Sequence, residues 1–343
     1  MRALVLSGGG ARGAYEAGVA SVLARSQVYD VISGASIGAI NAAFVASGRA
    51  DRLESFWQDT LPSRVPKLLP HIPKLRHMLA DFNALGNGSR WSDARRLIHA
   101  LSDMRFLNLF RERRGPLPPR IAALARELGT FLDLSAIRCR LMIAATNVTL
   151  GVPAIFYANG DGMPIRRVDD SAETSEWRAL QAEQFALSVL ASAALPGLMA
   201  PITLKFEDGV RSYGDGGLVH NSPIALAIDA GATDLTVVFV DPVSDAACSC
   251  PEHGVGHLIC AVFVMLQQRM LDYELRLVEA TNALIRNGSL AGRREIRVRC
   301  LRPEEPLEID ILGFDDTRGV AHAFRLGALD AQRSLDARKA SLV

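Results

Sequence analysis

The sequence has no run of about 18 apolar residues free of charge and proline, the length that a membrane-spanning helix needs. Its longest apolar segments, around residues 187–204 and 258–266, are interrupted by proline or are too short. The apolar stretch before Gly8 is also too short for a secretory signal. We therefore expect a cytoplasmic protein with no signal peptide and no transmembrane helix.

The chain also lacks a marked excess of charge and a disulfide-like set of cysteines. Its 343 residues carry 38 Lys and Arg against 37 Asp and Glu, which argues against a nucleic-acid-binding protein. Five cysteines at irregular spacing do not form a disulfide framework and fit a reducing compartment. With 49% hydrophobic residues and no internal repeat, the chain is long enough to bury a large core.

Positive charge is concentrated in residues 51–120, which hold 13 Lys and Arg against 7 Asp and Glu. Seven prolines break the helical pattern of residues 51–134 into short pieces, so we expect a helical cap here. Its apolar residues are Phe56, Trp57, Leu68, Leu69, Ile72, Leu75, Met78, Leu79 and Phe82, interspersed with Lys67, Lys74 and Arg76. This mixture predicts either a lid that makes peripheral contact with an anionic membrane or an ordinary cap packed on the sheet.

One serine stands between two glycines directly after a β-branched run, in Gly34-Ala35-Ser36-Ile37-Gly38. This G-x-S-x-G pattern is typical of a nucleophile elbow, in which a strand turns abruptly into a helix. The turn would expose the Ser36 hydroxyl at the N-terminus of a helix over residues 37–46. The helix dipole favours developing negative charge there, as an acyl-transfer transition state requires.

A glycine-rich loop, Gly8-Gly9-Gly10-Ala11-Arg12-Gly13, follows an expected strand at residues 2–7 and precedes a helix through about residue 25. The loop matches G-x-G-x-x-G, so a nucleotide-binding oxidoreductase is one alternative. That function needs an acidic residue at the end of the second strand, whereas Asp30 lies at its beginning. The N–H groups of the same loop are also suited to an oxyanion beside Ser36.

A serine nucleophile needs a base, and the sequence offers two candidates close together. His220 precedes Asn221 and Pro223, which look like the entry to a helix, so a structural role is favoured for it. Asp215 lies between glycines at the end of an expected strand, where a carboxylate is well oriented. Burial would have to raise its pKa from about 3.9, and a simple turn that bonds backbone N–H groups is the alternative.

Four blocks of the sequence together resemble the patatin-like phospholipases. They are the loop at residues 8–13, the elbow at 34–41, residues 191–196 with Pro201, and residues 215–217 with Asn221 and Pro223. The resemblance spans about residues 3–241. It implies that the protein is a serine lipid acyl hydrolase acting on lipid or phospholipid acyl esters, with no metal and no cofactor.

The same resemblance assigns roles to individual residues. It implies a catalytic dyad of Ser36 and Asp215 and an oxyanion hole from Gly8, Gly9 and Gly10. The supporting motif positions are Arg12, Gly13, Gly34, Ile37, Gly38, Gly216 and Gly217. Arg12 either orders the loop or attracts a phosphate head group. A catalytically silent lipid-binding protein of the same fold is a further alternative.

The β-α-β-α order of the first 47 residues, with the resemblance, predicts an α/β fold. We expect a three-layer sandwich with a central, mostly parallel sheet flanked by helices, plus the cap insertion at about 51–134. Residues 1–241 would form the catalytic domain, and residues 242–343 a helix-rich part packed on it. The remaining expected elements are strands at 28–32, 140–147, 154–158, 210–213, 234–241 and 295–301, and helices at 182–194, 258–286 and 320–338.

Five possible metal ligands fall within thirteen positions: Cys248, Cys250, His253, His257 and Cys260. Their spacing is not that of a standard zinc pair. We expect a reduced loop followed by an apolar helix here, and no metal site.

Overall fold

The structure is a computed structural model that describes residues 1–68, 117–160, 162, 175–195, 199–218, 223–242, 255–290 and 292–340. Its strands are β1 (Arg2–Leu6), β2 (Val31–Ala35), β3 (Arg140–Asn147), β4 (Val152–Asn159), β5 (Glu176–Ala179), β6 (Ile202–Phe206), β7 (Gly209–Gly214), β8 (Asp234–Val238) and β9 (Arg297–Leu301). Its α-helices are α1 (Gly13–Ser26), α2 (Ile37–Ala46), α3 (Leu53–Ser55), α4 (Leu61–Leu68), α7 (Pro119–Gly129), α8 (Phe185–Ser192), α9 (Ile224–Asp229), α10 (Val255–Arg286) and α11 (Thr317–Ala340). Shorter helical turns are η1 (Gly10–Arg12), η2 (Ala50–Arg52), η3 (Phe56–Thr60), η5 (Leu134–Ala136), η6 (Ala182–Gln184) and η7 (Gly216–Leu218).

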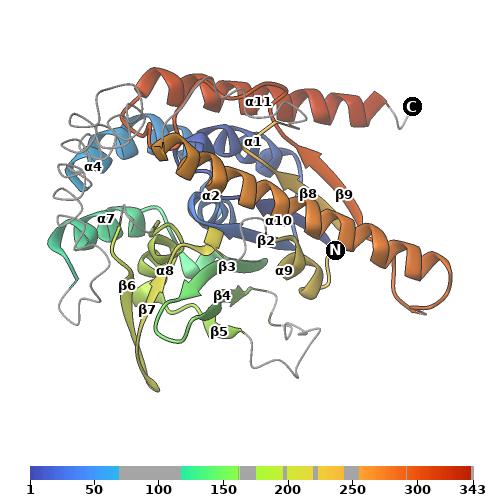
Figure 1. The fold of residues 1–343 in the computed structure, drawn as a ribbon, viewed down its shortest axis with the longest axis horizontal. Coiled ribbons are helices and arrows are strands. Elements are labelled where there is room, and N and C mark those ends of the chain that lie inside the picture. Colours follow the sequence, from blue (N-terminus) through green and yellow to red (C-terminus); the bar gives the residue numbers. More distant parts are fainter. Residues whose placement is uncertain are drawn as a thin grey trace.

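The strands form one sheet with helices on both faces (Figure 1). Their order is β5-β4-β3-β2-β1-β8-β9, and β7 joins β3 to β6. The pairs β3–β4, β3–β7 and β6–β7 are antiparallel, whereas the five other pairs are parallel. The predicted α/β fold with a mostly parallel central sheet is therefore confirmed.

The central strands contribute side chains to two cores, because successive residues of a strand point to opposite faces. Leu4 and Leu6 of β1 pack on the side of α1, α2, α7, α8 and α11. Ala3 and Val5 pack on the opposite side, with α9 and α10. Burial on both faces explains why the strands read as nearly continuous apolar runs.

Several element boundaries differ from the sequence prediction. The second strand begins at Val31 rather than at Val28, which is 83% exposed, and it continues to Ala35. It continues because the parallel ladders pair Gly34 with β1 and Ala35 with β3. The expected helix at 182–194 divides into η6 and α8, and the strand from residue 234 ends at Val238. The helix at 37–46 and the strand at 140–147 are confirmed at both ends.

The two ends of the expected cap pack on the core. Phe56 and Trp57 of η3 are 1% and 0% exposed, so these two residues contribute to the core rather than to an exposed apolar surface. The Trp57 indole N–H donates a hydrogen bond of 2.9 Å to the amide oxygen of Asn41 on α2. Residues 69–116, which hold most of the cap, lie outside the described residues.

The C-terminal part of the chain is built into the same sheet and helix layer. Strand β9 extends the sheet beside β8, and α11 lies along α1 (Figure 1). The two helices touch at glycines, since a Cβ at Gly327 would lie 1.9 Å from the Tyr15 carbonyl oxygen. The Tyr15 hydroxyl also donates to Asp330 at 3.0 Å. Among the described helices, none combines the length and the apolarity needed to cross a bilayer.

Replacing Gly38 with alanine should destabilise the fold, because the added methyl would lie 2.4 Å from the Ser7 carbonyl oxygen. We expect the free energy of unfolding, measured by urea titration, to fall by about 1–3 kcal/mol. Gly129→Ala is the matched control, because the nearest atom to its added methyl is the Ala186 Cβ at 3.9 Å. It should leave stability unchanged or raise it by up to about 1 kcal/mol. Equal losses in the two variants would contradict this packing.

Candidate active site

Ser36 occupies a sharp turn between β2 and α2. Its φ of 54° and ψ of −126° place it in a region that L-residues rarely adopt, and it is the one non-glycine residue with positive φ among the described residues. The flanking glycines permit this turn because a Cβ at Gly34 would lie 2.4 Å from the Gly38 carbonyl oxygen. The structure therefore has the elbow geometry that the sequence predicted.

Asp215 follows β7 and faces the Ser36 hydroxyl. Its Oδ2 accepts a hydrogen bond of 2.7 Å from Ser36 Oγ, and its Oδ1 accepts one of 2.7 Å from the Gly217 N–H. Its backbone carbonyl accepts a third from the Thr146 hydroxyl on β3, also at 2.7 Å. Asp215 is 1% exposed. Both carboxylate oxygens are thus fixed in position, and one of them contacts the hydroxyl.

Burial raises the pKa of Asp215 to about 6, and the hydrogen bonds from Ser36 and Gly217 lower it from a still higher value. A carboxylate with a pKa this close to neutrality accepts a proton far more readily than an exposed aspartate. It is still largely ionised at neutral pH. In this arrangement Asp215 can accept the hydroxyl proton of Ser36 while the Ser36 oxygen attacks a carbonyl carbon.

The glycine loop lies beside the elbow. A Cβ at Gly13 would lie 2.5 Å from the Ile37 side chain, which shows how closely the two motifs pack. Gly10 has a φ of 58°, and the next N–H, that of Ala11, donates to the Ile311 carbonyl at 2.9 Å. Within the described part of the chain, no acceptor is hydrogen-bonded to the N–H groups of Gly8 and Gly9.

Arg12, the residue before the last glycine of the loop, pairs with Asp241, which the sequence analysis did not single out. Its guanidinium hydrogen-bonds the carboxylate of Asp241, and the two side chains are only 14% and 19% exposed. Asp241 follows β8, so the ion pair joins the loop to the end of a neighbouring strand. The sequence shows that an acidic residue follows the apolar run of β8. It does not show that this residue pairs with Arg12, 229 positions earlier.

Gly216 and Gly217 support the turn that follows β7. A Cβ at Gly216 would lie 2.0 Å from the Ala144 carbonyl oxygen, so a larger residue would displace the turn from β3. His220 and Asn221, which follow this turn, lie outside the described residues. So do the side chains of Cys248, Cys250, His253, His257 and Cys260.

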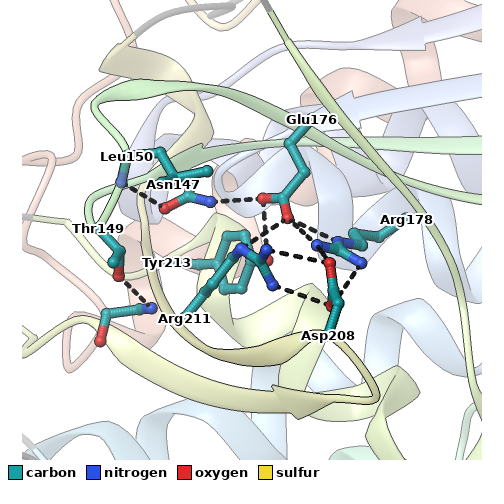
Figure 2. A network of polar contacts seen from close by, with 9 residues as sticks. Asn147, Thr149, Leu150, Glu176, Arg178, Asp208, Arg211 and Tyr213 are labelled. Carbon is teal, nitrogen blue, oxygen red and sulfur yellow. Dashed lines mark hydrogen bonds and ion pairs between the residues drawn. The ribbon is translucent and has the colours of Figure 1, made fainter.

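A charged network connects β3, β5 and β7 (Figure 2). Glu176 on β5 accepts hydrogen bonds from Asn147 on β3, at 2.5 Å, and from the Tyr213 hydroxyl on β7, at 2.9 Å. Two arginines, Arg178 and Arg211, bridge Glu176 to Asp208. Their hydrogen bonds lower the pKa of Asp208 to about 2. The network thereby joins β3, β5 and β7, and its Tyr213 lies two residues before Asp215 in the sequence.

A second polar cluster lies behind the glycine loop. The Asn41 amide donates to Glu16 at 2.9 Å and to the Gly13 carbonyl at 3.1 Å, besides accepting from Trp57. Burial raises the pKa of Glu16 well above its ordinary value, since this side chain is 0% exposed. The cluster connects α1, α2 and η3.

Comparisons with known proteins point to one family. A family model described as patatin-like phospholipase matches residues 4–228. The chain is 29% identical over 244 residues to a cGAMP-activated phospholipase from Escherichia coli strain TW11681. That match covers 65% of this chain and 53% of the relative, so the chain spans about half the length of this curated relative. Among solved structures, VipD from Legionella pneumophila is similar, with a TM-score of 0.39 and 15% identity over 98% of this chain and 67% of that one.

Replacing Asp215 with asparagine should stabilise the protein at pH 8. The folded pKa is raised, so ionisation of the buried carboxyl costs stability above pH 6, and this cost disappears as the pH falls from about 6 to about 4. We expect a gain of about 1–3 kcal/mol at pH 8 that vanishes near pH 4, measured by urea titration across this range.

Asp133→Asn is the control of opposite sign. The Asp133 carboxylate accepts hydrogen bonds from the Ser135 hydroxyl and, to a smaller effect, from the Ser135 backbone N–H, and both lower its pKa. Its ionised form therefore stabilises the fold, and the substitution should destabilise the protein at pH 8. A loss of stability in Asp215→Asn at pH 8 that does not change with pH would contradict the raised pKa.

Proposed function

The chain belongs to the patatin-like phospholipase family, as its four sequence blocks predicted, and we propose that it hydrolyses fatty acyl esters of lipids with Ser36 as nucleophile and Asp215 as base. The observation that carries this proposal is the 2.7 Å hydrogen bond from Ser36 Oγ to Asp215 Oδ2 at the elbow. A hydroxyl in contact with a correctly oriented base is the arrangement that nucleophilic catalysis requires.

In the first step the Ser36 oxygen attacks the ester carbonyl carbon while Asp215 accepts the hydroxyl proton. The carbonyl oxygen becomes negatively charged, and we assign its stabilisation to the N–H groups of Gly8, Gly9 and Gly10 beside the elbow. The tetrahedral intermediate then collapses. The alcohol or lysolipid leaves with the proton from Asp215, and the acyl group remains on Ser36.

In the second step water replaces the alcohol. Asp215 accepts a proton from the water, whose oxygen attacks the acyl carbonyl, and the fatty acid is released as Ser36 regains its proton. Each proton transfer is assigned to Asp215. The proposal therefore gives no role to a metal or a cofactor.

The family and the printed name of the curated relative support phospholipid acyl esters as the substrate class. We propose that Arg12 orders the glycine loop through Asp241, since its guanidinium is hydrogen-bonded to that carboxylate. Contact of residues 51–120 with an anionic membrane and a cytoplasmic location stay predictions of the sequence.

The nucleotide-binding alternative lacks a suitably placed acid. The Asp30 carboxylate accepts a hydrogen bond of 2.7 Å from the Arg2 N–H, at the start of β1. It therefore lies at the opposite end of β1 from the glycine loop. The end of β2 carries Ser36 instead of the acidic residue that would hold a ribose.

Ser36→Ala and Asp215→Asn should each lower hydrolysis of a soluble short-chain ester by about 10³-fold or more, because each removes one half of the reacting pair. The assay is run with EDTA present, and a fluorophosphonate probe should label the wild type but not Ser36→Ala. The matched control is Asp229→Asn on α9, because burial also raises the pKa of Asp229 to about 6. This control should keep full activity. Retention of activity in Ser36→Ala would exclude the mechanism, and an unlabelled, inactive wild type would favour a silent lipid-binding protein.

The pH dependence of kcat/KM should report Asp215. The base must be ionised, so activity should fall about tenfold per pH unit below a midpoint of about 6. The measurement is kcat/KM for the soluble ester between pH 4 and 8. Asp229→Asn should leave the midpoint unchanged. A profile that stays flat down to pH 4.5 would show that Asp215 does not have the raised pKa.

A further inference from the structure

The C-terminal end of α8 contacts both members of the proposed pair. Ser192, the last residue of α8, accepts a hydrogen bond of 2.9 Å from the backbone N–H of Ser36. Two residues later, the carbonyl oxygen of Ala194 accepts one of 3.1 Å from the backbone N–H of Asp215. Residues 192–194 therefore accept hydrogen bonds from the backbone N–H groups of Ser36 and Asp215, which are 179 positions apart.

The Ser192 hydroxyl has one possible orientation. It also lies 2.6 Å from the Ala144 carbonyl oxygen on β3, which can only accept a hydrogen bond. The single hydroxyl hydrogen must therefore point to Ala144, which leaves the oxygen lone pairs for the Ser36 N–H. Ser192 is 0% exposed, so its hydroxyl is shielded from water.

The position of the bond on the elbow gives it a specific effect. Ser36 adopts a φ of 54°, and such a conformation persists only where surrounding contacts hold it. An N–H that loses its partner in a part-buried contact costs free energy, so loss of the Ser192 oxygen favours a relaxed backbone at Ser36. Relaxation would move Ser36 Oγ away from Asp215.

The carbonyl that orients Ser192 also lies against Gly216, the residue after Asp215. The Ala144 carbonyl is the group that a Cβ at Gly216 would meet at 2.0 Å, next to Asp215. Ser192 is thus connected through Ala144 to the turn that carries the base, and directly to the elbow that carries the nucleophile.

We propose that Ser192 is a positioning residue that holds the elbow in its reactive conformation and, with Ala194, sets the distance between Ser36 and Asp215. This inference rests on the proposed function of that pair. It also implies that the Ser36 N–H is occupied and does not contribute to the oxyanion hole.

Ser192→Ala should lower kcat for a soluble ester about tenfold or more, with a smaller change in KM, because the hydroxyl acts on the reacting serine rather than on substrate binding. The rate of fluorophosphonate labelling of Ser36 should fall in parallel. The acid limb of the pH profile should also move to higher pH, since the Ser36 hydrogen bond that lowers the pKa of Asp215 is weakened.

Ser188→Ala is the matched control. Ser188 lies one turn earlier on α8 and is 2% exposed, and no hydrogen bond joins it to Ser36 or Asp215 in the described part of the chain. It should reproduce any general loss of stability from removing a buried serine hydroxyl on α8, while leaving kcat and the pH profile unchanged. Equal effects of Ser188→Ala and Ser192→Ala on kcat would overturn the inference.

A second pair of variants separates the hydroxyl from the volume at this position. Ser192→Thr keeps the hydroxyl, whereas Ser192→Val has the same shape without it, so both carry the same steric cost. Ser192→Thr should be at least fivefold more active than Ser192→Val, and equal activities would overturn the inference. If the wild type is active and Ser36→Ala is inactive, equal activities of Ser192→Thr and Ser192→Val overturn only the role of Ser192 and leave the proposed function intact. If Ser36→Ala keeps the wild-type activity, the proposed function fails and the inference fails with it.

Discussion

Ser36 and Asp215 lie 2.7 Å apart because three stretches of backbone approach one another more closely than side chains would allow. The carbonyl of Ser7 meets the Cα of Gly38, the carbonyl of Gly38 meets Gly34, and the carbonyl of Ala144 meets Gly216. At each contact an added methyl would lie within 2.4 Å of a backbone oxygen. The glycines of the motifs are thus required where α2 packs on the ends of β1 and β2 and where the Asp215 turn packs on β3, and the geometry of the pair depends on that packing.

The same region holds features that destabilise the fold. A buried carboxyl and a serine with positive φ both cost free energy, and the surroundings have to keep them in place. Hydrogen bonds that involve backbone groups perform most of this work. Ser192 accepts one from the Ser36 N–H, the Thr146 hydroxyl donates one to the Asp215 carbonyl, and the Gly217 N–H donates one to the Asp215 carboxylate. Charged groups act further out, as the Arg12–Asp241 pair and the network around Glu176. The supporting contacts are therefore most buried closest to the reacting atoms and become more exposed with distance.

Local patterns in the sequence predicted the elements that carry the site, because strand–turn–helix order and glycine spacing are local properties. The helix at 37–46 and the position of Asp215 at the end of a strand followed from such patterns. The start of β2 did not, since the β-branched Val28 is exposed and only pairing with β1 decides where the strand begins. The partners of Arg12 and Ser36, namely Asp241 and Ser192, depend on contacts between distant segments. No single sequence shows such contacts.

Strand β8 lies between β1 and β9, and both of its neighbours pair with it in parallel. The stretch that identifies the family, residues 4–228, ends before β8. A fragment cut at that point would leave β1 as an open sheet edge, with unpaired N–H and C=O groups along an apolar strand. It would also lose Asp241 and α11, and with them the anchor of the glycine loop and the cover of α1. The limits of the recognisable motif are therefore not the limits of a foldable unit, and an excised motif would present a template for aggregation.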